Sequence, residues 1–327
     1  MALHDDLKKA ITDALPDATC AIGWGQGPEA FRHVPHFMSE AGDVDSFEAG
    51  FFSVHNPALF LPEYKGKKVV VVAKGCDSRS IGQQVAEGLV RREDVTIIGF
   101  PCNGVIDQDK LAALLVNGKT SLGVIEPGLL TSVTDDGDRL VLAAQGSEAT
   151  VLKQAVTADK CTRCRYPNAL HADIFVGDER APVVEKDEYP DLAMLEAMPL
   201  EERLAFWEKE MSRCTRCYAC RNACPMCVCR DHCIATSREP EWITQADSTR
   251  DKLFFQIIHA VHLAGRCTGC GECQRACPVG IPLLLLKRSL ARSVEQLFGY
   301  EAGVSLEATS PLLQFEIEEH RIKERDW

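Results

Sequence analysis

Two near-identical cysteine runs in the second half of the chain carry the residues best suited to chemistry. Each run spaces four cysteines as C-x2-C-x2-C-x3-C and ends in proline. This is the ligand spacing of bacterial ferredoxins, in which the fourth cysteine binds the other of two clusters. The spacing therefore assigns one [4Fe-4S] cluster to Cys214, Cys217, Cys220 and Cys277, and a second to Cys267, Cys270, Cys273 and Cys224.

Tetrahedral zinc is the alternative for these cysteines, because zinc also binds CxxC pairs. Zinc sites usually combine two such pairs rather than two runs of four cysteines that each end in proline. Pro225 and Pro278 suit the first turn of a helix, where a missing N–H costs no hydrogen bond, so the fourth cysteine of each run is expected to begin a helix. The pattern favours iron–sulfur clusters over zinc.

The first half of the chain follows a strand–helix–strand pattern. Residues 69–73 and 95–100 are short apolar runs typical of buried strands, and residues 81–90 carry apolar side chains at helical spacing. Asp77 or Ser78 is expected to cap that helix. A crossover of this length predicts two parallel strands. Further along, residues 130–145 predict a hairpin that turns at Asp136 and Gly137.

Four more cysteines are placed where such a sheet binds ligands. Cys76 and Cys102 follow the two predicted strands, and open α/β sheets bind ligands beyond the carboxyl ends of their strands. Cys161 and Cys164 form a further CxxC pair, so that the four thiolates suffice for a third [4Fe-4S] cluster. The alternatives are zinc or buried structural thiols, since cysteine is among the residue types most often buried.

The second half resembles the helical ferredoxin family, known from iron–sulfur subunits of succinate dehydrogenase and small subunits of heterodisulfide reductase. The resemblance covers residues 200–297. It is carried by the two cysteine runs and by helical patterns over residues 200–211, after Ser248, where Asp251 completes a capping-box spacing, and over residues 281–297. The resemblance implies a module that passes single electrons between protein partners.

Residues 67–180 resemble the beta-subunit family of deazaflavin-reducing hydrogenases and deazaflavin-dependent formate dehydrogenases. The motifs are Lys74-Gly-Cys-Asp, Gly99-Phe-Pro-Cys, and Cys161-Thr-Arg-Cys followed by His171-Ala-Asp-Ile-Phe-Val-Gly-Asp. The resemblance implies one [4Fe-4S] cluster on Cys76, Cys102, Cys161 and Cys164, beside FAD. It also implies flavin contacts from Lys74, Arg79, Asp173, Gly177 and Asp178, although Lys74 and Arg79 are equally compatible with solvated surface charges.

Four cysteines remain outside these sets. Cys20 is expected to be a buried strand residue. Cys227, Cys229 and Cys233 are expected either to pack as thiols near a cluster or to take part in metal binding, in altered ligation of one cluster or in a separate site with His232.

Together these patterns predict an α/β domain with a parallel sheet, followed by an all-α helical ferredoxin domain. The predicted divisions are residues 1–190, with one cluster, residues 191–300, with two clusters, and a tail over residues 301–327. The tail is expected either to dock on a partner subunit or to pack back on this chain.

Composition excludes several functions. The 327 residues include 36 Lys and Arg against 48 Asp and Glu, a formal charge of −12, which disfavours binding to nucleic acid or to an anionic membrane. No apolar run approaches the roughly 20 residues of a membrane span, and the charged N-terminus lacks a secretory pattern, so a cytoplasmic location is expected.

The sequence thus predicts an electron-transfer subunit of an anaerobic redox complex that carries three [4Fe-4S] clusters. By resemblance, its partners are hydrogenase, formate dehydrogenase or heterodisulfide-reductase-like subunits in a hetero-oligomer. The alternative is an FAD-containing dehydrogenase that itself oxidises NADH or a reduced deazaflavin. A metal-held scaffold with redox-silent zinc is a third reading, which the ferredoxin-type runs disfavour.

Overall fold

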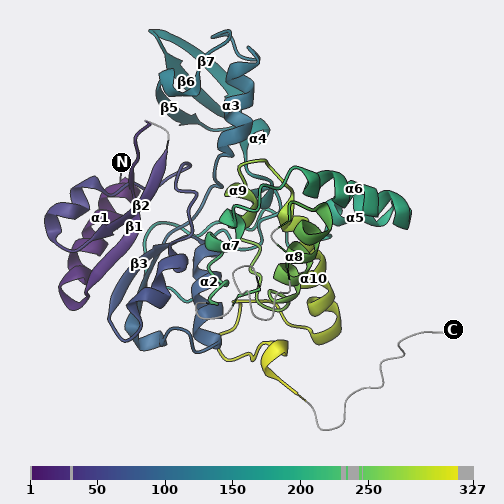
Figure 1. The fold of residues 1–327 in the computed structure, drawn as a ribbon. Coiled ribbons are helices and arrows are strands. Elements are labelled where there is room, and N and C mark those ends of the chain that lie inside the picture. Colours follow the sequence, from purple (N-terminus) through teal and green to yellow (C-terminus); the bar gives the residue numbers. More distant parts are fainter. Residues whose placement is uncertain (1, 30–31, 230–232, 235–242, 245, 316–327) are drawn as a thin grey trace.

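The computed structural model describes residues 2–29, 32–229, 233–234, 243–244 and 246–315. An α/β part comes first in the chain, and a helical part packs beside it (Figure 1). A small three-stranded lobe projects from the α/β part (Figure 1). This arrangement is consistent with the predicted order of an α/β region followed by a helical region.

A five-stranded sheet forms the centre of the α/β part. Its strand order is β2 (His33–Met38), β1 (Cys20–Gln26), β3 (Val69–Ala73), β4 (Val95–Gly99) and β8 (Ile174–Phe175). The pairs β1–β3, β3–β4 and β4–β8 are parallel, as predicted, whereas β2 pairs antiparallel with β1 at one edge. The sheet is therefore mixed, and its two cysteine-bearing strands are direct neighbours.

Strand β3 is apolar on both faces because helices cover both faces of the sheet. Val70 and Val72 belong to a core shared with α1 (Ala2–Ala14), and the alternate residues of β3 belong to a second core shared with α2 (Gly75–Ala86). A continuous run of buried β-branched residues is typical of parallel strands in this environment.

Helix α2 begins one turn earlier than Asp77 or Ser78 would cap it, so that prediction is wrong. Lys74 is its N-cap residue, and the Asp77 carboxylate lies inside the first turn, where it accepts a hydrogen bond of 3.1 Å from the Lys74 N–H. The helix ends at Ala86 because Gly88 takes a left-handed φ of +67°. The apolar residues after Gly88 therefore lie beyond the helix end.

The small lobe contains the predicted hairpin. Strands β5 (Leu130–Asp136) and β6 (Arg139–Ala144) form that hairpin, and a third antiparallel strand, β7 (Ser147–Leu152), extends it. Helix α3 (Gln108–Val116) covers this sheet and shares an apolar core with it, and the short helix α4 (Lys153–Val156) leads out of the lobe.

The helical part confirms the three predicted helices. At the start of the central one, the Ser248 hydroxyl accepts a hydrogen bond of 3.0 Å from the Asp251 N–H, which caps the helix as predicted. No helix in the described residues is long and apolar enough to cross a membrane. The helices are α5 (Pro190–Glu196), α6 (Leu200–Ser212), α7 (Ala219–Asn222), α8 (Thr249–Val261), α9 (Glu272–Arg275) and α10 (Leu283–Phe298).

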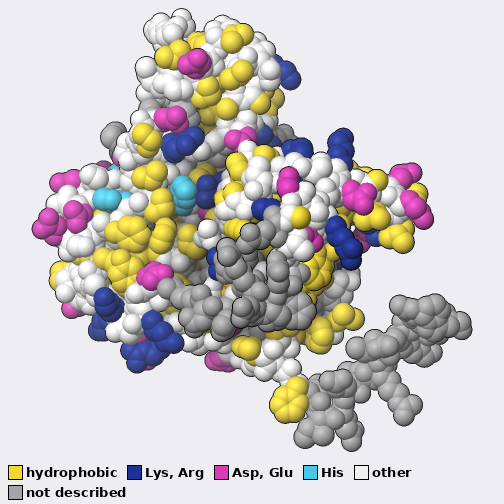
Figure 2. All heavy atoms as spheres, viewed as in Figure 1, with side chains coloured by type: hydrophobic (Ala, Val, Ile, Leu, Met, Phe, Trp, Pro, Cys, Tyr) yellow, Lys and Arg dark blue, Asp and Glu magenta, His cyan; other side chains and the backbone are white. Residues whose placement is uncertain are grey.

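The start of the predicted tail packs back on the α/β part. The Tyr300 hydroxyl and the Gly303 N–H both donate to the buried side-chain oxygen of Gln83 on α2, at 2.8 and 2.9 Å. Leu312 and Phe315 are exposed, and Trp327 lies outside the described residues. On the face shown in Figure 2, basic and acidic side chains of the described residues are interspersed rather than gathered in a basic patch.

Candidate iron–sulfur centres

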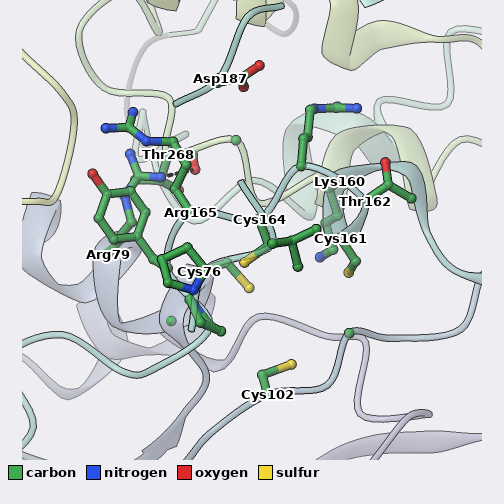
Figure 3. Close-up of a pocket in the computed structure, with 18 of the residues that line it drawn as sticks. Cys76, Arg79, Cys102, Lys160, Cys161, Thr162, Cys164, Arg165, Asp187 and Thr268 are labelled. Atoms are coloured by element: carbon green, nitrogen blue, oxygen red, sulfur yellow. Dashed lines mark hydrogen bonds between the residues drawn. The ribbon is translucent and has the colours of Figure 1, made fainter. Parts of the chain in front are cut away.

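The structure brings together the four cysteines predicted for the third cluster. Cys76 lies in the first turn of α2 directly after β3, and Cys102 follows β4. Cys161 and Cys164 come from the segment that leaves the small lobe, and all four line one cavity of about 780 Å³ (Figure 3). Neighbouring parallel strands deliver the first two cysteines to one edge, and the returning segment closes the site over them.

The two ferredoxin-type runs exchange their fourth cysteines. Cys214, Cys217 and Cys220 of the first run line a small hollow together with Cys277 of the second run. Conversely, the Cys224 thiol of the first run lies within electrostatic range of the other three cysteines of the second run, which are Cys267, Cys270 and Cys273. The structure therefore groups these eight cysteines in the predicted sets. The Cys214 set is Cys214, Cys217, Cys220 and Cys277, and the Cys267 set is Cys267, Cys270, Cys273 and Cys224. The four cysteines at the cavity are the Cys76 set.

The fourth cysteine of each run follows the end of a helix. The expectation that it begins a helix is therefore wrong. Cys224 follows α7 and Cys277 follows α9, each one residue after the helix C-cap. Pro225 and Pro278 come next, a position where proline is common because it cannot continue a helix.

The donor chemistry at all three sets fits iron–sulfur clusters, and in the set of Cys267, Cys270, Cys273 and Cys224 the Gly269 backbone N–H donates to the Cys267 sulfur. Backbone N–H groups point at the sulfurs: Val105 donates to Cys161, Arg216 to Cys214 and Ile281 to Cys277, each at 3.4 Å. Such hydrogen bonds are among the features that set cluster potentials. The side-chain amide of Gln256 adds a donor to the Cys220 sulfur at 3.6 Å.

The two runs also share one backbone conformation. Left-handed φ values occur at the second and fourth residues after the first cysteine of each run, at Arg216 and Tyr218 in one and at Gly269 and Gly271 in the other. These turns aim N–H groups back at the preceding sulfur. Non-glycine residues rarely adopt this conformation, so its repetition in the first run indicates a functional constraint.

Burial controls the protonation of these thiols. Burial raises the pKa of Cys102 to about 11 and that of Cys270 to about 12. It also raises the pKa of Cys76 and of Cys224 well above the ordinary value. Neighbouring thiolates and acids add to these shifts. Only the thiolate binds metal. Cluster binding must therefore displace protons from these sulfurs, which makes cluster affinity depend on pH.

Two lysines that were not predicted from the sequence lie between the three cysteine sets, the half-buried Lys160 and the buried Lys287. The Lys160 ammonium donates to the Cys270 carbonyl at 2.5 Å and lies within electrostatic range of Cys76 and Cys161, so it faces two sets at once. Burial lowers the pKa of Lys160, but the facing thiolates raise it further, and the net shift is upward.

Lys287 on α10 occupies the equivalent place between the other two sets. It is 2% exposed, and its ammonium has no hydrogen-bond partner among the described residues. It lies within electrostatic range of Cys224, Cys267 and Cys273 of one set and Cys220 of the next. The sequence does contain a signal for this position. Lys287 follows the buried Leu283 by four residues and the buried Leu284 by three, a spacing that places it on the apolar face of the helix.

The flavin contacts implied by resemblance are only partly at the cavity. Lys74 and Arg79 line it, but neither is a solvated surface charge. The Lys74 ammonium is fully buried, paired with Asp77 at 2.7 Å and lying 3.8 Å from the centre of the Trp24 ring, so it is already committed to internal partners.

Asp173, Gly177 and Asp178 do not line the cavity, so the structure does not bring them together with Lys74 and Arg79 there. The Asp173 carboxylate instead binds the Arg92 guanidinium at 2.6 Å and accepts from the Ile97 N–H at 2.8 Å, which ties β8 to β4. Gly177 packs against Leu3 and Pro101 on the side of α1.

Arg79 joins the α/β part to the helical part. Its guanidinium donates to the Thr268 carbonyl at 3.2 Å and to the Ala302 carbonyl at 2.8 Å, and it pairs with the Glu301 carboxylate at 3.1 Å. These contacts bring the second cysteine run to the rim of the cavity beside Cys76.

We expect Arg79→Ala to weaken this junction by about 2 kcal/mol, the scale of a lost hydrogen bond to a charged group. Hydrogen–deuterium exchange should then rise in α2 and in residues 300–303 while the small lobe is unchanged. Arg79→Lys keeps the positive charge but loses the planar guanidinium that donates to several acceptors at once, so it should give an intermediate increase in exchange. Unchanged exchange in Arg79→Ala would show that the junction does not depend on this residue.

Comparisons with known proteins support the iron–sulfur reading. Residues 210–281, which contain all eight cysteines of the two runs, match the family of 4Fe-4S dicluster domains. The helical part therefore contains a dicluster domain.

The whole chain is similar to "F420-dependent formate dehydrogenase subunit beta" of Methanocaldococcus jannaschii, with 23% identity covering 94% of this chain and 93% of the relative. It is also similar to "F420-dependent formate dehydrogenase 1 subunit beta" of Methanococcus maripaludis, with 24% identity covering 94% and 90%. A chain of the F420-reducing [NiFe] hydrogenase complex from Methanosarcina barkeri aligns with a TM-score of 0.40 and 15% identity over 51% of this chain and 61% of that chain. The sequence relatives confirm the resemblance to the beta-subunit family.

Proposed function

We propose that this chain is the electron-transfer subunit of an anaerobic redox complex and that it holds three [4Fe-4S] clusters. The partner would be a formate dehydrogenase, hydrogenase or heterodisulfide-reductase-type subunit, and the relay would connect it with another electron carrier. The relatives, named as beta subunits of F420-dependent formate dehydrogenases, support this class of partner.

One observation carries the proposal: the three cysteine sets are neighbours in a row. Lys160 faces both the Cys76 set and the Cys267 set, and Lys287 faces both the Cys267 set and the Cys214 set. The row begins at the cavity between the α/β part and the helical part and ends at the exposed Cys217. This order supports electron passage from the cavity, through the Cys267 set, to a surface near Cys217.

The chain's residues hold and tune the centres, while bound clusters supply the one-electron chemistry. Thiolates fix the clusters, backbone N–H groups stabilise negative charge on sulfur, and burial excludes water. The ammonium groups of Lys160 and Lys287 offset the negative charge that the thiolates concentrate between neighbouring sets.

We expect Lys287→Met to lower the reduction potentials of the two ferredoxin-type clusters, because a lost positive charge makes an added electron less favourable. The shift should be on the order of 50–100 mV, the Coulomb energy of a unit charge roughly 8–15 Å away at an effective dielectric constant of about 20. Potentiometric titration followed by EPR measures it. Lys186→Met is the matched control because that side chain is 75% exposed, and equal potentials in all three proteins would rule out the tuning role.

The functional proposal is tested by purifying the tagged chain anaerobically from its native host. A formate dehydrogenase, hydrogenase or heterodisulfide-reductase-like subunit should co-purify, and adding formate or hydrogen to the complex should produce EPR signals of reduced clusters. A chain that purifies alone, with clusters that stay oxidised under both substrates, would contradict the proposal.

The cavity supports a second candidate function, that of an FAD-containing dehydrogenase acting on NADH or a reduced deazaflavin. At about 780 Å³ it lies in the size range of cofactor sites and exceeds the other hollows described here. Arg165 and Tyr166 line it beside Cys164, giving a cation and an aromatic face. Extraction of about one FAD per chain, together with viologen reduction by NADH or reduced deazaflavin in the isolated chain, would establish this function; absence of flavin would remove it.

A further inference from the structure

Three cysteines of the helical part belong to none of the three sets. Cys227, Cys229 and Cys233 follow the first ferredoxin-type run closely, and the hydrogen bond from the Cys227 N–H to the Cys224 carbonyl, at 3.1 Å, keeps the chain turned at that point. Cys20, the other cysteine outside the sets, is buried in β1, as predicted.

The three cysteines line one hollow at the surface of α8. Its volume, about 20 Å³, equals that of the hollow among the Cys214 set. In neither hollow do three described His, Cys, Asp or Glu side chains converge as closely as around a single ion. The two hollows are therefore alike in volume and in the absence of such close convergence among the described side chains.

A buried histidine completes the lining. His259 on α8 is 4% exposed, and neither ring nitrogen has a hydrogen-bond partner among the described residues. Its ring stacks on Phe255 at 5.5 Å between centroids, which fixes its plane. An unpartnered buried polar group is costly, and a ligand in the hollow would satisfy one nitrogen.

Burial also keeps the imidazole neutral. Burial and, to a smaller extent, the nearby positive charge of Lys287 together lower the pKa of His259 to about 2. The neutral imidazole is the form that ligates metals.

Positive charge surrounds the three sulfurs. The Arg221 guanidinium donates to the Cys233 sulfur at 3.2 Å and to the Cys229 carbonyl at 2.8 Å. Arg266, held by Glu87 at 2.6 Å, also lines the hollow and lies within electrostatic range of Cys229. These guanidinium groups would offset the negative charge of thiolate ligands in the hollow.

We propose that Cys227, Cys229, Cys233 and His259 hold a fourth metal centre, ligated by three thiolates and one imidazole. This donor set suits a [4Fe-4S] cluster, whose ligands lie farther apart than those of a single ion such as zinc. His232, the histidine considered from the sequence, lies outside the described residues, and His259 takes that role here.

The test is metal analysis of the full chain, purified anaerobically, with iron and zinc counted per chain by mass spectrometry. We expect the double variant C227S/C233S to lose about four iron atoms relative to the wild-type chain, whereas loss of about one zinc ion and no iron would overturn the assignment of a cluster. His259→Asn should weaken retention of the same metal. Because the readout is a difference from the wild-type protein, it does not depend on whether three other clusters are present.

Two variants serve as controls. His262→Asn changes the other histidine that lines the hollow, and Cys20→Ser changes a buried thiol elsewhere; both should keep the wild-type metal content. EPR signals of the remaining clusters should be preserved in C227S/C233S. Unchanged iron and zinc in C227S/C233S would overturn the proposal, as would metal loss accompanied by loss of all cluster signals.

Discussion

Replacement of Lys74 by methionine is expected to lower the free energy of unfolding of the α/β part by about 3–5 kcal/mol, the cost of breaking a buried ion pair on one side. Lys74 and Asp77 side chains are 2% and 1% exposed, and the ammonium also donates to the Ser53 carbonyl at 2.8 Å. The variant would leave the Asp77 carboxylate buried without its cation and would remove the cation over the Trp24 ring.

Denaturant unfolding followed by circular dichroism measures this effect. Lys68→Met is the control, because Lys68 is an exposed lysine beside the same strand. The double variant K74M/D77L should recover part of the loss, since no unpaired charge remains. A loss below about 1 kcal/mol in K74M would contradict the assigned role of the pair.

Replacement of Gly75 by alanine is expected to remove the third cluster. A methyl group at this position would lie 1.8 Å from the Tyr166 carbonyl oxygen and 2.8 Å from that of Asn168, both backbone atoms. The segment that carries Cys164 would have to move away from the first turn of α2, where Cys76 lies. The site would then lose its four-cysteine geometry, and iron should fall by about four atoms per chain relative to the wild-type protein, the content of one cluster.

Iron quantification measures the loss, and Gly50→Ala is the matched control. Alanine at Gly50 would meet nothing within 4 Å, and its backbone conformation is accessible to any residue. Full iron content in Gly75→Ala would show that the close approach of α2 to residues 166–168 is not what assembles the site.

Much of the fold follows from local pattern. The strands at residues 69–73 and 95–99 have continuous apolar runs, and the hairpin has a turn sequence, so both were predictable. The antiparallel edge strand β2 and the third lobe strand β7 were not predicted, because their alternation is weak and their pairing depends on partners elsewhere in the chain. The start of α2 was misplaced because Asp77 caps from within the first turn.

The cysteine ligands were predictable because ligand chemistry fixes their spacing in the sequence. The roles of residues that are positioned by tertiary packing were not predictable. Cysteine runs carry their ligand geometry in the sequence, which is why the eight cysteines of the dicluster domain could be grouped in advance. Lys160 precedes Cys161 and reads as an ordinary surface charge; only the packing of the two halves buries it against Cys270. Likewise, Asp173 matched a flavin-family motif, but its carboxylate is used by Arg92.

The most direct test of the central claim is iron and acid-labile sulfide quantification on the anaerobically purified C227S/C233S variant, which lacks the proposed fourth centre, with integration of the EPR spins after full reduction. Three clusters predict about twelve iron atoms and about three spins per chain. About eight iron atoms and two spins would contradict the claim, because they would leave Cys76, Cys102, Cys161 and Cys164 without a cluster and end the row of centres at the dicluster domain.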